Sequence, residues 1–107
     1  MKHCRLLVHR LEVDSTDVAV RLGTLVVVRR PGSEHLDWEV VAQTTGDSTA
    51  ELGENLLGMT VVSGADPNGV PELSELSGNA VVARYVDEAV VWRGNGVLVG
   101  FDDDWLA

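Results

Sequence analysis

The chain is poor in several residue types, and each shortage excludes a class of protein. Cys4 is the only cysteine among 107 residues, so the chain forms no internal disulfide, unlike small secreted scaffolds with their even sets of cysteines. The longest apolar runs, such as residues 25–28, are far shorter than the about 20 residues of a membrane-spanning helix. Charged residues such as Arg5 and Arg10 interrupt the N-terminal stretch, which is not the pattern of a secretory signal peptide. We therefore expect a cytoplasmic protein.

Positive charge is also scarce. The chain has 8 Lys and Arg against 17 Asp and Glu, which gives a net charge of −9. Binding to phosphate backbones needs clustered cations, so we expect no direct nucleic-acid binding and no binding to anionic membranes. The shortage is uneven, because no Lys or Arg lies between Arg30 and Arg84, whereas the first 36 residues carry a small positive excess.

Valine is what the chain has in abundance, and its placement predicts the fold class. β-Branched residues lose side-chain freedom in helices and pack well on pleated sheets. Short valine-rich runs recur about every ten residues between polar turns, a spacing typical of all-β proteins. Expected strands cover residues 4–13, 18–30, 38–44, 59–63, 80–86, 89–93 and 97–101. We expect one mainly β domain over residues 1–107, a small β-barrel or sandwich of about six to seven antiparallel strands.

Turn and helix signals complete the expected organisation. The polar residues 14–17 and 66–69 are typical of tight turns, and the Gly-Asn-Gly of residues 94–96 is typical of a β-hairpin. Residues 48–51, Ser-Thr-Ala-Glu, have the form of a helix capping box and precede a leucine pattern, which predicts one short helix near residues 49–57. Residues 71–76, which precede the expected strand 80–86, fit a helical turn or a loop equally well.

No catalytic or metal-binding motif emerges from the spacing of the reactive residues. The three histidines show no zinc-ligand spacing, and Cys4 and His9 should face opposite sides of one strand. His35 fits a surface loop, and residues 102–104, three aspartates, fit a solvated segment better than a cation site. The apolar pair Trp105 and Leu106 that follows predicts that the end of the chain folds back onto the body. We expect no cofactor and no metal, and the sequence favours a binding protein over an enzyme.

Two arginines stand inside apolar strands of the C-terminal third. On a sheet with one solvated face, Arg84 and Arg93 belong to the outward side. If both point into a hollow barrel instead, they form an anion-binding site together with Tyr85 and Trp92, because guanidinium forks match carboxylates. This second hypothesis predicts a barrel that binds a small anionic or aromatic molecule, with or without transforming it.

The acidic residues suggest the main functional hypothesis. If the middle of the chain lies on one side of the fold, its uncompensated acids form a surface for a basic protein partner. The alternative is that the charge only keeps a small domain soluble. The residues expected on this surface are Glu34, Asp37, Glu39, Asp47, Glu51, Glu54, Glu72 and Glu75. Exposed strand edges or Trp105 also make a homodimer conceivable.

Overall fold

The computed structural model describes residues 1–44 and 53–107. The seven strands are β1 (Lys2–Val13), β2 (Thr16–Val18), β3 (Val20–Arg29), β4 (Leu36–Thr44), β5 (Glu54–Ala65), β6 (Pro71–Val86) and β7 (Ala89–Gly94). In the described part of the chain, the one helical element is the short 3-10 turn η1 (Asp103–Trp105). The β class expected from the valine pattern is confirmed.

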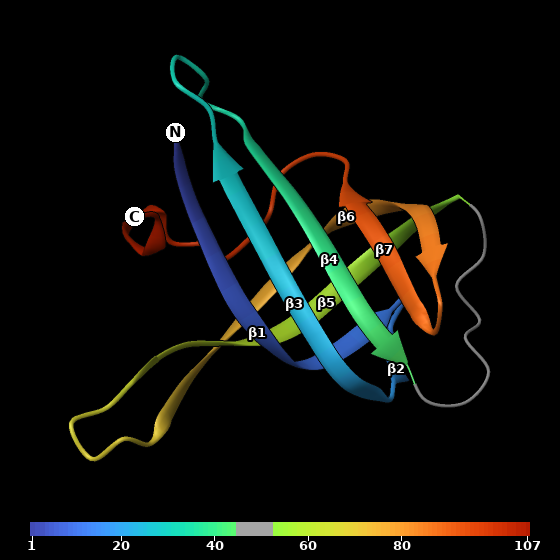
Figure 1. The fold of residues 1–107 in the computed structure, drawn as a ribbon, viewed down its shortest axis with the longest axis horizontal. Helices are drawn as coiled ribbons and strands as arrows, with labels where there is room; N and C mark the ends of the chain where they lie inside the picture. Colours follow the sequence, from blue (N-terminus) through green and yellow to red (C-terminus); the bar gives the residue numbers. More distant parts are fainter. Residues whose placement is uncertain (45–52) are drawn as a thin grey trace.

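Six of the strands form a closed antiparallel barrel (Figure 1). The strand order is β2-β1-β3-β4-β7-β6-β5, and pairing between β1 and β5 closes the ring. Strand β1 makes closure possible because it bends at a register shift between Val8 and Arg10. Its first half pairs with β3, and its second half pairs with β5 and with the extra strand β2.

Alternate side chains of β1, β3, β4, β5 and β6 fill the barrel interior, whereas β7 buries four successive residues, Ala89 to Trp92. Along β4, Trp38, Val40 and Ala42 are buried, as their alternation in the sequence predicts. Trp92 of β7 is the largest fully buried side chain, and the other large, fully buried side chains are leucines and valines from β1, β3, β4, β5 and β7. Their burial is the main source of stability, at roughly 1.5–3 kcal/mol for each large apolar side chain.

The Trp38 indole of β4 packs against two glycines, Gly94 of the neighbouring strand β7 and Gly78 of β6. A Cβ added at Gly94 would overlap the Trp38 indole, and one added at Gly78 would lie 2.7 Å from it. Both positions therefore need glycine. The indole Nε1–H also donates a hydrogen bond to the Gly96 carbonyl at 3.1 Å, which holds the chain after β7 against the end of the barrel.

The prediction of a helix near residues 49–57 is wrong for the part of that range that the structure describes. Residues 54–57 belong to β5, which pairs with β6 from Glu54↔Val81 to Ala65↔Pro71, and residues 49–52 lie outside the described residues. A leucine pattern that fits one face of a helix is overridden by this long ladder, in which Leu57 points inward and Leu56 outward. The segment from Pro71, expected as a helical turn or a loop, is the start of β6.

The segment after β7 also differs from expectation. Residues 97–101 do not form a strand of their own, and the Gly-Asn-Gly before them is not a hairpin turn. The segment continues alongside β6 through an isolated bridge between Ser77 and Val99, and Leu98 is buried at the end of the barrel. Trp105 and Leu106 pack on the core, and Ala107 exchanges backbone hydrogen bonds with His3, so the expected fold-back is confirmed.

Candidate interaction surface

The structure does not gather the eight predicted acidic residues into one patch. Asp37 and Glu39 lie on β4, whereas Glu54, Glu72 and Glu75 lie on β5 and β6. Strand β4 is separated from β6 by β7 and lies across the barrel from β5, and β3 and β4 pass in front of β5 in Figure 1. The two groups therefore lie on different walls. Of the remaining predicted residues, Glu34 is exposed in the loop before β4, and Asp47 and Glu51 lie outside the described residues.

The acids of β4 are paired with arginines. The Asp37 carboxylate lies 3.2 Å from the Arg30 guanidinium. Glu39 stands between two further arginines, with carboxylate oxygens 3.8 Å from Arg84 and 3.9 Å from Arg93. The negative charge of this wall is thus largely compensated, and it does not form an acidic surface.

The hairpin of β5 and β6 is acidic without compensation. Its residues 54–79 include no Lys or Arg, and we call this segment the acidic hairpin. Within the described residues, neither Glu72 nor Glu75 lies within 4.0 Å of a basic group. Asp66 is occupied differently, because its carboxylate accepts hydrogen bonds from the backbone N–H groups of Asn68 and Val70 and shapes the turn.

The far end of the acidic hairpin projects beyond the barrel. Strand β5 is paired with β1 only as far as Leu7↔Val62, and the residues beyond form a two-stranded arm, at the lower left of Figure 1. Large apolar side chains accompany the acids there, since Leu73 is 52% exposed and Val70 is 57% exposed. Exposed apolar groups beside uncompensated charge are typical of a surface that contacts another protein.

An outer groove of about 400 Å³ continues this surface toward β1. Gly58 leaves its floor open because it has no side chain, and Glu12 and Glu75 stand on its two sides. Arg10 also lines the groove, but it donates hydrogen bonds from Nε and Nη2 to both carboxylate oxygens of Asp17. This contact lowers the pKa of Asp17 and raises that of Arg10. The groove therefore keeps the negative charge of its two glutamates.

The four residues predicted as a ligand site inside a hollow barrel do not converge there. Arg84 and Arg93 are exposed on the outer face beside Glu39, while Trp92 is fully buried in the packed interior. A register shift between Val82 and Arg84 is the physical cause, because it turns Val82 inward and Arg84 outward. Tyr85 is 52% exposed beyond this shift.

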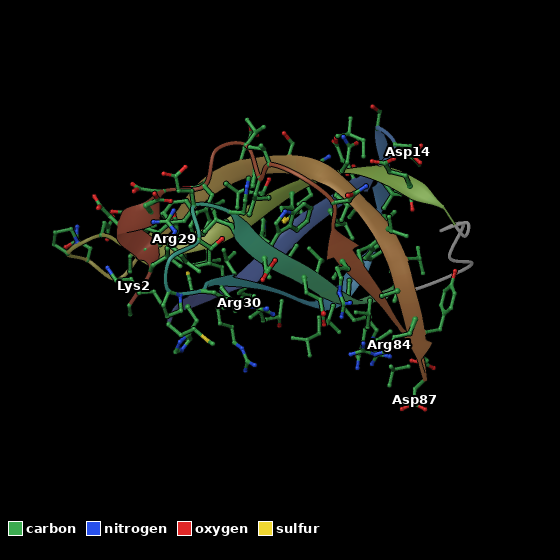
Figure 2. The ribbon with its side chains drawn as sticks, turned by 90° about the horizontal axis from the view of Figure 1, so that it is seen from above. Lys2, Asp14, Arg29, Arg30, Arg84 and Asp87 are labelled. Atoms are coloured by element: carbon green, nitrogen blue, oxygen red, sulfur yellow. The ribbon has the colours of Figure 1, made fainter. Side chains whose placement is uncertain are left out.

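The register instead assembles an arginine surface that sequence reasoning missed. Arg5, Val26, Glu39 and Arg93 form one row across β1, β3, β4 and β7. We call this face, with Arg5, Arg30, Arg84 and Arg93, the arginine wall. It includes a groove of about 480 Å³ that contains Val26 and Val28 and is flanked by Arg30 and Arg93. No spacing in the sequence signals this set, because its arginines come from β1, β6, β7 and the loop after β3. In Figure 2, Arg30 and Arg84 lie on one side of the barrel and Asp14 on the other.

Other reactive groups do not assemble into a site among the described residues. Cys4 is buried, and the loss of hydration raises the pKa of its thiol, which makes it a poor nucleophile. His35 lies in the β3–β4 loop, where its backbone N–H contacts the Ser33 hydroxyl. In residues 1–44 and 53–107, no group of three or more His, Cys, Asp or Glu side chains could hold a metal ion. The same ranges contain no helix with the length and hydropathy needed to cross a membrane.

Comparison of the chain with protein-family models, curated proteins and solved structures finds no match.

Proposed function

We propose that this protein is a binding module whose acidic hairpin engages a basic protein partner. The observation that carries this proposal is that Glu72 lies on the projecting arm, Glu75 lies where the arm joins the barrel, and neither has a basic group within 4.0 Å among the described residues. An acid that no internal cation neutralises attracts a basic surface, and complementary potentials accelerate encounter.

The exposed apolar residues of the arm supply the second component of binding. Electrostatic attraction between exposed charges contributes little affinity, about 0–1 kcal/mol for each pair. Burial of Leu73 and Val70 against a partner adds roughly 25 cal/mol for each Å² of apolar area removed from water. The cytoplasmic setting belongs to the same proposal, and it is supported by a single, buried cysteine that a reducing compartment leaves unpaired.

Binding of a basic probe tests the proposal. The probe is a fluorescent ten-residue peptide of alternating lysine and valine, and its anisotropy reports binding. We expect the double variant E72R/E75R to bind it about tenfold more weakly than the natural chain. The matched control E34R/D104R makes the same change in net charge at exposed positions outside the hairpin, and it should retain most of the affinity.

Salt provides the second arm of this experiment. Binding that depends on the hairpin acids should weaken steeply as the salt concentration rises, because exposed charges are screened within about 8 Å at physiological ionic strength. An affinity indifferent to salt, or equal losses in E72R/E75R and in the control, would contradict the proposal.

A further inference from the structure

We infer that the basic partner of the acidic hairpin is the arginine wall of a second copy of this chain, an inference that rests on the proposed function. The two surfaces are complementary in charge. The acidic hairpin has no Lys or Arg, whereas the arginine wall has four arginines around Asp37 and Glu39, a local excess of positive charge in a chain of net charge −9.

The arginines of this wall keep hydrogen-bonding capacity for an added carboxylate. Arg84 and Arg93 approach Glu39 only to 3.8 and 3.9 Å, beyond the range of a hydrogen bond. A guanidinium carries five N–H donors and binds carboxylates through two parallel hydrogen bonds. A glutamate from another molecule can therefore bind here without breaking a hydrogen bond between these arginines and Glu39.

The apolar parts of the two surfaces also correspond. Strand alternation places Leu73 and Glu75 on one face of β6, two residues apart. The groove of the arginine wall offers Val26 and Val28 to an apolar side chain, with Arg93 beside them. An arm that inserts Leu73 into this groove brings Glu75, which lies on the same face of β6, to the arginines at the groove's sides. The arm can reach another molecule because it projects beyond its own barrel (Figure 1).

The position of the two surfaces determines what kind of assembly results. Strand β5 of the hairpin lies across the barrel from β4, and Glu72 and Glu75 lie at the opposite end of β6 from Arg84, so one copy does not satisfy both surfaces internally. Copies then associate head-to-tail, with the acidic hairpin of one molecule on the arginine wall of the next. A row of copies therefore always keeps one free hairpin and one free wall at its two ends. The net charge of −9 opposes association, but screening within about 8 Å at physiological salt leaves the local contacts dominant.

A charge-swap experiment tests this inference by sedimentation equilibrium. At physiological salt, the weight-average mass of the natural chain should rise as its concentration increases from about 10 µM to about 1 mM. The variants R84E/R93E and E72R/E75R should each remain monomeric, because their two surfaces then have like charge. An equimolar mixture of the two should associate again, since each variant complements the other.

Two further variants serve as controls. E34R/D104R should associate like the natural chain, and R5E/R30E is a second variant of the arginine wall for the case that R84E/R93E unfolds.

The outcomes distinguish a failure of this inference from a failure of the proposed function. A natural chain that stays monomeric at all concentrations, or a mixture that fails to associate, overturns the inference. If the lysine–valine peptide still distinguishes E72R/E75R from its control in that case, the hairpin binds basic partners but not a second copy. If the peptide binds both variants equally, the proposed function fails as well.

Discussion

Asp14 connects the surface of the barrel with its buried tryptophan. Its carboxylate accepts hydrogen bonds from the Leu56 backbone N–H at 2.8 Å and from the Asn55 amide at 2.9 Å. Asn55 is the one buried polar residue in the described ranges, and its amide oxygen accepts a hydrogen bond from the Trp92 indole at 3.4 Å. The bond from Leu56, and after it the bond from Asn55, lower the pKa of Asp14.

This lowered pKa predicts a pH-dependent contribution to stability. A carboxylate whose pKa falls on folding stabilises the native state above its ordinary pKa of about 4, and the stabilisation is lost as the pH falls through the folded pKa. We expect Asp14→Asn to lower the free energy of unfolding at pH 7, with a deficit that shrinks as the pH falls from about 4. Asparagine accepts the backbone φ of 50° at this position, so geometry contributes little to the difference.

Urea unfolding at several pH values measures this effect, with Asp87→Asn as the matched control. Asp87 has a similar φ of 53° and is exposed in the turn between β6 and β7. It therefore serves as the baseline against which the pH dependence of Asp14→Asn is judged. Parallel curves for Asp14→Asn and the natural chain would contradict the role assigned to the Asp14 carboxylate.

At the scale of elements, the contact of β4 with β6 and β7 depends on glycines under Trp38. We expect Gly94→Ala to destabilise the fold by about 1–3 kcal/mol, because a methyl group there overlaps the indole and forces the strands apart. Gly58→Ala is the matched control, since its added Cβ would lie 3.5 Å from Glu12 in ordinary contact. Equal stability of the two variants in urea would show that Trp38 adjusts without cost.

Alternation along the sequence predicted the elements whose pairing is regular. Strand β4 is the best example, because its buried residues follow the two-residue period without a shift. The period could not place Arg84, since the register shift after Val82 reverses the face of every residue that follows. The expected helix failed for a related reason. Its leucines fit a local helical pattern, but Leu56 and Leu57 pair with Asn79 and Gly78 of β6, more than twenty residues away in the chain.

At the scale of the whole molecule, the sequence predicted an excess of acid over base but not its distribution in space. A stretch from residue 31 to residue 83 without Lys or Arg suggested one acidic surface. The strand order instead places Glu39 of β4 near Arg84 of β6 and Arg93 of β7, which are far along the chain, while Asp37 pairs with the nearby Arg30 in the loop after β3. The candidate surface thereby narrows to the acidic hairpin, and the arginine wall emerges only from the pairing of strands around the barrel.

This distribution leaves two opposing electrostatic contributions to stability, which salt can separate. At about 0.01 M salt the screening length is about 30 Å, close to the 38 Å length of the molecule, so the net charge of −9 repels itself across the whole fold. The ion pairs of the arginine wall act over less than 4 Å and are exposed, so each contributes little. We therefore expect the urea midpoint of a dilute sample to rise from about 0.01 M to about 0.15 M salt, with a smaller rise for E34R/D104R, in which two acids become bases. A midpoint that falls with salt would instead show that the ion pairs outweigh the net repulsion.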